Sequence, residues 1–266
     1  MRLKAVILGC GSSAGVPRVA QGWGACDPAN PRNRRRRCSL LIEREGDKGV
    51  TTVLIDVGPD LREQLIAADV RHVDGVLMTH PHADHIHGVD DLRPLYLQSG
   101  RRVDMYMDEP TALAVKAKFA YVFTTPEGSS YPPIAADLRL AAGRPCRIDG
   151  AGGAIEAIPF DLDHGEITAL GFRIGGLAYT PDVSRIPEAS RPLLEGLDVW
   201  ILDALRYRTH PSHFSLDQAL AEIEAMRPKR AILTNLHTDL DYETLRKRLP
   251  EPIIPAYDGL RVEGWG

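Results

Sequence analysis

The sequence of 266 residues has few cysteines, and no two of them form a CxxC pair. Cys10, Cys26, Cys38 and Cys146 are scattered, which favours a reducing cytoplasm and predicts no disulfide framework. No segment approaches the roughly 20 apolar residues that a membrane span needs. The short apolar run at the N-terminus lacks a cleavage site of small residues, so we expect a first strand there and no signal peptide. These absences predict a cytoplasmic protein without a membrane partner.

A large excess of charge is also missing, since the net charge is −4 and charged residues make up 26% of the chain. We therefore do not expect a large nucleic acid as a partner. The one basic cluster, Arg34–Arg37, either meets a polyanion locally or is a solvated loop. The chain has no internal repeat and no low-complexity linker, and its 44% hydrophobic residues suffice for a full core. We expect a single domain over residues 1–266.

Apolar runs of strand length recur along the chain, close together at first and later alternating with helical stretches. This order is typical of an α/β protein with two sheets and helices outside them. The expected strands are Val6–Leu8, Ser39–Ile42, Val53–Val57, Val76–Met78, Val103–Met107, Ile155–Pro159, Gly171–Ile174, Leu177–Tyr179, Val199–Leu202 and Ala231–Leu233. The expected helices are Asp60–Ala68, Val89–Leu97, Thr111–Tyr121, Leu216–Met226 and Tyr242–Leu249. The proline-rich stretch Thr124–Asp137 indicates a lid over the site or an ordinary surface loop.

The strongest chemical signal is the run His80-Pro81-His82-Ala83-Asp84-His85. It follows an apolar strand, at the end of which α/β folds place their sites. Pro81 prevents a helix from continuing through the histidines. Mixed imidazole and carboxylate ligands suit zinc, manganese or iron better than calcium or magnesium. The run therefore predicts a transition-metal site and not a His-rich surface loop.

Three further residues that could bind a metal follow strand-like runs downstream, namely His164, Asp182 and His237. Each alone is weak evidence, because a lone His or Asp after a strand is more often a cap. Together with the first motif they complete two ligand sets. We expect His80, His82 and His164 to hold one metal, and Asp84, His85 and His237 to hold the other. Asp182 would lie between the two.

The sequence resembles the metallo-β-lactamase superfamily, and Asp182 stands where its phosphodiesterase branch, including RNase Z and PhnP-type enzymes, has a bridging Asp. Gly9–Arg18, Arg34–Ser39 and Leu54–Arg62 also resemble PhnP-type proteins. The resemblance implies an αββα sandwich of two mixed sheets. It also implies opening of small cyclic phosphodiesters, such as ribose 1,2-cyclic phosphate or 2′,3′-cyclic nucleotides. PhnP relatives often carry a cysteine cluster for a structural zinc, but only Cys26 remains here, so we do not expect that extra site.

Two divalent ions, Zn²⁺ or Mn²⁺, could bridge a water and lower its pKa, which would give a hydroxide nucleophile that Asp84 orients. The departing alkoxide then needs a proton from a histidine that is not a metal ligand. By resemblance to these phosphodiesterases we expect that acid to be His213, with His210 as its rival. Either histidine could instead make a helix-start contact.

Several other side chains have candidate roles near this site. Asp56 and Asp203 each end a strand and could orient an imidazole or cap a turn, and His87 fits a supporting role better than ligation. Phosphate contacts are expected from the glycine-rich loop and from the segment before His210; the candidates are Ser12, Ser13, Arg18, Arg206 and Arg208. A tight turn would explain the glycines of that loop equally well.

Two other functions remain open on the sequence alone. RNase Z-like RNA processing is disfavoured, because no long insertion with clustered Lys and Gly is present to grip tRNA. A PqqB-like or nucleotide-binding protein with little turnover is the other alternative. The expected partner is a small phosphodiester or nucleotide, and the protein could form a homodimer.

Overall fold

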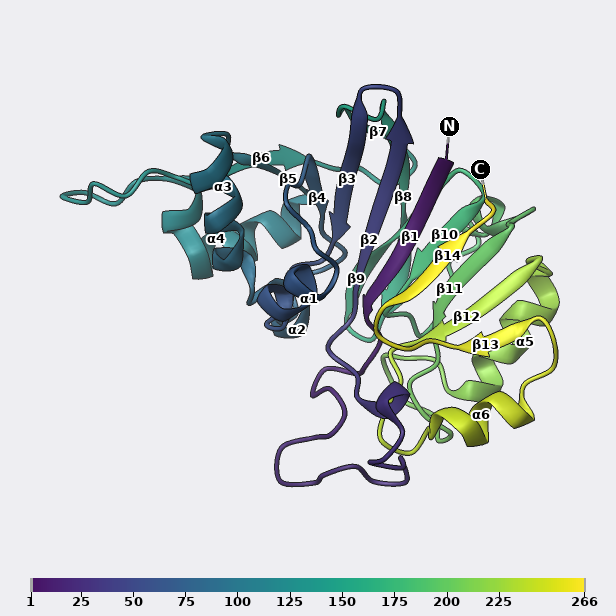
Figure 1. Ribbon diagram of the computed structural model, residues 1–266. Helices are drawn as coiled ribbons and strands as arrows, with labels where there is room; N and C mark the ends of the chain where they lie inside the picture. The colour runs from purple at the N-terminus through teal and green to yellow at the C-terminus, as the bar shows by residue number, and fades with distance from the viewer. Residues whose placement is uncertain (1, 266) are drawn as a thin grey trace.

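The computed structural model describes residues 2–265, which form two seven-stranded sheets packed face to face (Figure 1). The first sheet has the order β14 (Leu260–Glu263), β1 (Arg2–Gly9), β2 (Ser39–Gly46), β3 (Gly49–Ile55), β4 (Gly75–Leu77), β5 (Val103–Met107) and β6 (Ala135–Arg139). The second has the order β13 (Ile253–Pro255), β12 (Arg230–Thr234), β11 (Val199–Asp203), β10 (Leu177–Thr180), β9 (Ile167–Ile174), β8 (Ile155–His164) and β7 (Cys146–Ile148).

Helices cover the outer face of each sheet, which makes the αββα sandwich that the resemblance implies. The outer side of the first sheet carries α1 (Leu61–Ala67), α2 (Ala83–Ile86), α3 (Arg93–Ser99) and α4 (Glu109–Phe123). The outer side of the second carries α5 (Leu216–Met226) and α6 (Tyr242–Arg248). Short 3₁₀ turns lie at Pro31–Asn33, Val89–Leu92 and Arg191–Leu194. None of the helices in the described part of the chain is long and apolar enough to span a membrane.

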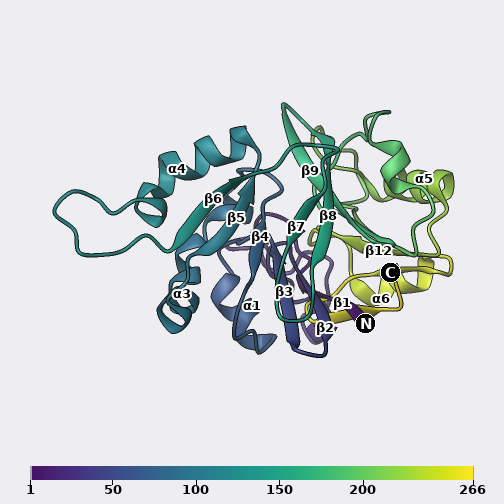
Figure 2. The same ribbon diagram turned by 90° about the horizontal axis from the view of Figure 1, so that it is seen from above.

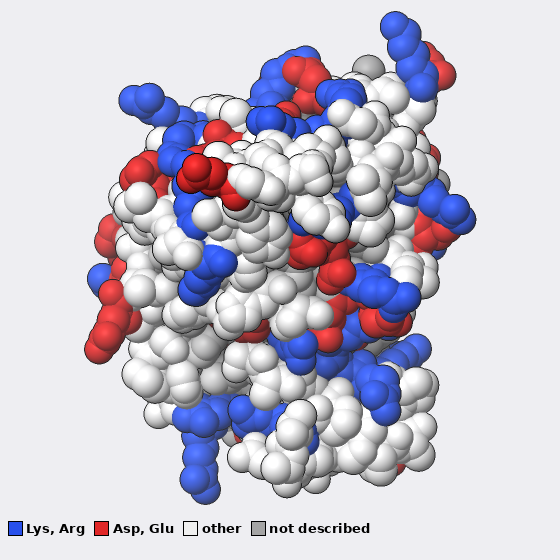
Figure 3. Space-filling model, turned by 90° about the vertical axis from the view of Figure 1, so that its left-hand side faces the viewer, with Lys and Arg blue, Asp and Glu red and all other residues white. Residues whose placement is uncertain are grey.

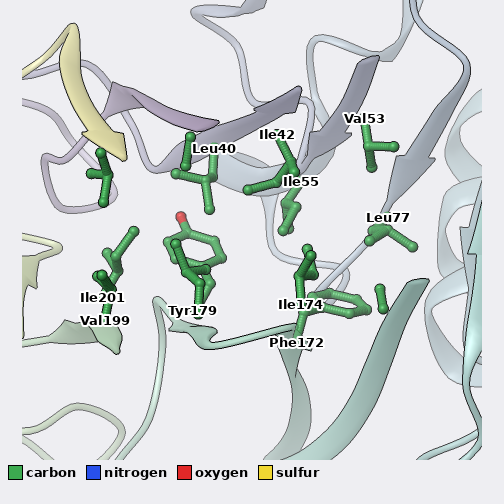
Figure 4. Packing of buried hydrophobic residues seen from close by; sticks show 14 of the residues in the cluster. Leu40, Ile42, Val53, Ile55, Leu77, Phe172, Ile174, Tyr179, Val199 and Ile201 are labelled. Atoms are coloured by element: carbon green, nitrogen blue, oxygen red, sulfur yellow. The ribbon is translucent and has the colours of Figure 1, made fainter. Parts of the chain in front are cut away.

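The main core fills the space between the two sheets (Figure 4). Alternate residues of each strand point inward, because side chains along a strand alternate between its two faces. The first sheet contributes Leu40, Ile42, Val53 and Ile55, and the second contributes Phe172, Ile174, Tyr179, Val199 and Ile201. Two further apolar clusters join the sheets to their helices.

Strand direction brings several chain segments to one edge of the sandwich. β3 to β6 are parallel to one another, and β10 to β13 are also parallel. β8 is antiparallel to β9, and β9 is antiparallel to β10, so β8 runs in the same direction as β10. The loops that follow β4, β8, β10, β11 and β12 therefore supply side chains to a shared site.

Each of the ten expected strands and five expected helices matches an element of the structure. The bounds of Val103–Met107 and Leu216–Met226 are the same as those expected, and the bounds of the others are shifted. The expected helix Val89–Leu97 is a 3₁₀ turn followed by α3, because Pro94 takes an early position in that helix. The expected loop Thr124–Asp137 is too long, since β6 begins at Ala135. The remaining segment, residues 124–134, projects from the body as an arm between α4 and β6 (Figures 1 and 2).

Candidate metal centre

The first histidines lie where β4 ends and α2 begins. His80 follows the strand, and His82 precedes the first turn of α2, as Pro81 between them requires. The loop is held from β3, since the Asp56 carboxylate accepts hydrogen bonds from the Thr79 amide at 2.8 Å and the Thr79 hydroxyl at 2.8 Å. A side chain on Gly58 would collide with the Asp84 carbonyl, so only glycine allows α2 to pack this closely.

Three imidazoles converge at this edge. His82 Nδ1 lies 3.0 Å from His80 Nε2 and 3.1 Å from His164 Nε2. The outer nitrogens are engaged elsewhere, since His80 Nδ1 is 2.9 Å from Thr79 Oγ1 and His164 Nδ1 is 2.6 Å from the Ser212 carbonyl. A carbonyl only accepts, so His164 carries its proton on Nδ1 and presents the Nε2 lone pair inward.

Burial lowers the pKa of His80 well below its ordinary value and also lowers the pKa values of His82 and His164. All three imidazoles are therefore neutral near pH 7. Each neutral ring has one N–H, so three converging nitrogens cannot all pair with one another. A divalent cation among them would satisfy the lone pairs, and a set of three imidazoles fits zinc.

Asp182 and His85 form a second group with His80. Asp182 Oδ1 is 3.3 Å from His85 Nε2, yet among residues 2–265 no hydrogen bond of good geometry reaches this buried oxygen. Asp84 Oδ2 lies 3.4 Å from the same His85 nitrogen. Burial would lower the pKa of His85, but the surrounding carboxylates of Asp182, Asp56 and Asp84 raise it well above its ordinary value. This negative surrounding favours a cation.

His213 joins His164 and Asp182 in a third group. Its Nδ1 lies 2.8 Å from Asp203 Oδ2 and 3.8 Å from Asp182 Oδ2, so the Asp203 carboxylate orients the ring. Burial alone would lower the pKa of His213, but Asp203 raises it to about 9. Burial in turn raises the pKa of Asp203 to about 7. The rival His210 lies with its ring 5.1 Å from that of His213, and its Nδ1 accepts from the Ser212 hydroxyl.

His237 is not brought into any of these three groups. Its Nε2 lies 2.7 Å from Arg18 Nη1, so the expected set of Asp84, His85 and His237 is not assembled. The side chain that β12 delivers beside His213 is Asn235, whose amide nitrogen is 3.1 Å from His213 Nδ1 and donates to the Pro181 carbonyl. In the sequence, His237 was expected to bind a metal because it is a histidine that follows a strand. No sequence signal indicated a role for Asn235.

The remaining candidates have different positions. The hydroxyl of Ser12 is buried and finds no partner among the described residues, whereas Ser13 is exposed in a turn. Arg206 donates to the carbonyls of Arg208 and Thr209, and Arg208 is exposed. Asp56 and Asp203 each bond to an imidazole and also accept from a backbone amide, so both of the roles left open for them are present. His87 is exposed and packs its ring 5.6 Å from that of Phe119.

Comparison with known families gives a match over residues 51–235 to the beta-lactamase superfamily domain. A curated relative, an octanoyltransferase of Porphyromonas gingivalis, is 32% identical over 98% of this chain. The chain spans only 51% of the length of that relative.

Solved structures agree with this match. The structure of a new diphosphatase from the PhnP family is 36% identical, with a TM-score of 0.88 over 99% of this chain and 98% of the other. The Zn²⁺-bound PqqB from Methylobacterium extorquens has a TM-score of 0.76 over 97% of this chain and 99% of its own, but is 18% identical and so shares the fold alone.

Proposed function

The chain belongs to the metallo-β-lactamase superfamily and is of the PhnP type, and from that premise we propose that it opens small cyclic phosphodiesters. It is a metal-dependent hydrolase. The proposed substrates are ribose 1,2-cyclic phosphate or 2′,3′-cyclic nucleotides. The proposed cofactors are two divalent ions, Zn²⁺ or Mn²⁺, with residues 1–266 acting as one domain.

The pair formed by His213 and Asp203 carries this proposal. It supplies a proton donor whose Nδ1 is 3.8 Å from a carboxylate of the metal centre. Cleavage of a P–O bond to a sugar oxygen releases an alkoxide, which leaves poorly without a proton. With Nδ1 engaged by Asp203, the Nε2–H of protonated His213 remains to deliver that proton.

The other side chains divide into two sets around Asp182. His80, His82 and His164 would hold one ion, Asp84 and His85 would hold the other, and Asp182 would contact both. Such ions lower the pKa of water and offset the charge of phosphoryl oxygens. The carboxylate of Asp84 would orient the attacking water, and the outward hydrogen bonds of His80, His85 and His164 keep the inner nitrogens of these rings unprotonated.

A second reaction, hydrolysis of a diphosphate bond, is favoured by the similarity to the PhnP-family diphosphatase. The same residues would serve both reactions, because each breaks a P–O bond. The leaving group differs, however, since a phosphate leaves more easily than an alkoxide and depends less on a proton from His213.

The alternatives have less support. The arm formed by residues 124–134 contains no Lys or Arg, so it offers no cationic grip for tRNA in the manner of RNase Z. A PqqB-like protein with little turnover would not need the oriented acid His213. We propose a small phosphodiester or nucleotide as the partner.

The test is a hydrolysis screen with Zn²⁺-loaded and Mn²⁺-loaded protein against cyclic and linear nucleotides, ribose cyclic phosphates, diphosphate-bridged nucleotides, lactams and thioesters. We expect the highest kcat/KM on a cyclic phosphodiester. Preference for a diphosphate would select the second reaction. Preference for a lactam or thioester, or binding of nucleotides without any turnover, would overturn the proposal.

A further inference from the structure

A guanidinium and an imidazole from distant parts of the chain meet beside the metal centre. Arg18 Nη1 lies 2.7 Å from His237 Nε2, although 219 residues separate them. Arg18 belongs to the loop between β1 and β2, where its backbone pairs with Gly22 in both directions at 2.8 Å. Because a guanidinium can only donate, His237 Nε2 must be the acceptor and is not free to bind a metal in this arrangement.

The opposite side of the His237 ring is also fixed. Its Nδ1 lies 3.2 Å from Asp239 Oδ1 and 3.2 Å from the Thr238 hydroxyl. Burial lowers the pKa of His237, so the ring is neutral; its one proton is on Nδ1, which donates a hydrogen bond to Asp239. Asp239 and His237 together hold the Arg18 side chain in place, and the group that contacts the guanidinium directly is a neutral imidazole.

Arg18 differs from its neighbours in lacking an acidic partner. Within residues 2–265, no carboxylate lies at ion-pair distance from Arg18, whereas Arg37 in the adjoining segment pairs with Asp60 at 2.8 Å. The buried Arg35 donates its hydrogen bonds to other groups of the protein, including the Leu240 carbonyl at 2.7 Å. Arg18 is half-buried, and one of the five N–H donors of its guanidinium is engaged by His237. The remaining N–H donors are available to bind an anion such as a phosphate.

The order of the strands in the second sheet gives the distance between the Arg18–His237 pair and the metal centre. Asp182 follows β10, and His237 follows β12, with β11 between them. Neighbouring strands are about 4.8 Å apart, which places the two residues roughly 10 Å apart. Arg206 adds positive charge near His237. Figure 3 shows Lys and Arg side chains in the lower part of the molecule, the end at which Figure 1 places the loop between β1 and β2.

We propose that Arg18, held by His237 and Asp239, binds a second phosphate group of the substrate while the first phosphate is cleaved at the metal centre. This inference rests on the proposed phosphoester hydrolysis and adds to it a preference for substrates that carry a second phosphate group, as in the second, diphosphate reaction; a substrate with one phosphate would not use Arg18. The buried Ser12 hydroxyl lies in the same loop, and the Ser12 amide bonds to the carbonyl of Leu236, next to His237. The role of His237 is then to position an arginine.

The test uses the metal-loaded full chain and two substrates, ADP-ribose with two phosphates and bis(p-nitrophenyl) phosphate with one. For Arg18→Ala we expect kcat/KM on ADP-ribose to fall at least 10-fold through KM, with bis(p-nitrophenyl) phosphate changed less than 2-fold. Arg18→Lys should lie between, because an ammonium keeps the charge but loses the fork. Arg144→Ala, an exposed arginine in another loop, is the matched control and should change neither substrate. Equal losses on both substrates would overturn the proposal.

Two further measurements separate this inference from the function on which it rests. Calorimetric binding of ADP to the metal-loaded chain should weaken at least 10-fold in Arg18→Ala, whether or not any ester is hydrolysed. Metal content should stay at the wild-type value in Arg18→Ala and His237→Ala. Unchanged ADP binding, or loss of one metal equivalent in His237→Ala, would overturn the role of Arg18. Absence of hydrolysis with intact ADP binding would overturn the hydrolase function alone.

Discussion

The Nδ1 atom of His85 and the Oδ2 atom of Asp56 lie 2.7 Å apart, with both side chains almost completely buried. Asp56 directly follows β3 and has a positive φ of 65°, a conformation that an aspartate tolerates better than most residues. The Asp56 carboxylate also accepts hydrogen bonds from Thr79, which fixes the loop that carries His80. The same carboxylate fixes the tautomer of His85 by accepting from its Nδ1. The backbone at Asp56 therefore places the carboxylate that orients the His85 ring and the loop of His80.

We predict that Asp56→Asn weakens binding of the metal at His85 by about 10- to 100-fold, the usual effect of losing an outer partner of a ligating imidazole. The amide keeps the shape of the carboxylate but loses the charge that holds the Nδ1 proton. Competition with a chelating dye measures the affinity. Asp149→Asn, at an exposed carboxylate, is the control. Equal affinities in Asp56→Asn and wild type would contradict the orienting role.

His82→Ala should remove the metal held by His80, His82 and His164, together with nearly all turnover. The two remaining imidazoles are too few to hold the metal, because the lost His82 Nδ1 is the atom that lies within 3.1 Å of both His80 Nε2 and His164 Nε2. Metal content by mass spectrometry and kcat on bis(p-nitrophenyl) phosphate are the measurements. The matched control is His87→Ala, because this exposed histidine lies in none of the ligand groups. Undiminished activity in His82→Ala would refute the site.

The sequence predicted those parts of the site that depend on local order. The run from His80 to His85 is short, so its three histidines come close together; Asp84 lies 3.4 Å from His85 Nε2 but in none of the three groups. His164 and Asp182 were found because each follows a strand, and parallel strands end at one edge. His237 also has a metal-binding side chain and follows a strand. Its Nε2 nevertheless lies against Arg18, a contact between residues 219 positions apart that no local sequence pattern shows.

A similar limit applies to the fold. The strands in the middle of each sheet have near-continuous apolar runs and were predicted, because both of their faces are buried. The missed strands are β6, β7, β13 and β14, which are three to five residues long and lie at or next to a sheet edge. Such short segments take their structure from pairing with a neighbour, which the sequence pattern does not record.

For His213→Ala we expect the metals to stay bound while kcat falls most on diesters with poor leaving groups. A p-nitrophenolate leaves without a proton, whereas a ribose alkoxide needs the one from Nε2. The measurement is the ratio of kcat/KM for a 2′,3′-cyclic nucleotide to that for bis(p-nitrophenyl) phosphate, compared between variant and wild type. His210→Ala provides the rival comparison. Equal losses on both substrates in His213→Ala would argue against the general acid.

Asp203→Asn should shift the alkaline limb of kcat/KM toward lower pH. Burial lowers the pKa of His213, but the carboxylates of Asp203, Asp182 and Asp84 raise it to about 9, so removing the charge of Asp203 lowers it. Activity that needs protonated His213 is lost as pH rises through this pKa, and a lower pKa brings the loss earlier. A pH profile on a cyclic nucleotide measures the shift. An unmoved or upward-shifted limb would contradict the coupling between the two residues.

Asp241→Ala should destabilise the fold by about 1 kcal/mol at pH 7, because Asp241 caps the N-terminus of α6. Its carboxylate accepts from the Thr244 amide at 2.9 Å and from the Asn33 side chain at 2.7 Å, which ties the loop between β1 and β2 to the helix. Burial would raise the pKa of Asp241, but these hydrogen bonds lower it to about 2.

A folded-state pKa below the ordinary value of 3.8 means that the stabilisation is present above about pH 4 and is lost as pH falls toward 2. Urea unfolding of wild type and Asp241→Ala at pH 7, 5 and 3 should show a gap that stays constant between 7 and 5 and narrows at 3. Asp241→Asn keeps a capping oxygen and should cost less than alanine at pH 7. A gap that widens at pH 3 would show that the ionised carboxylate does not hold this loop.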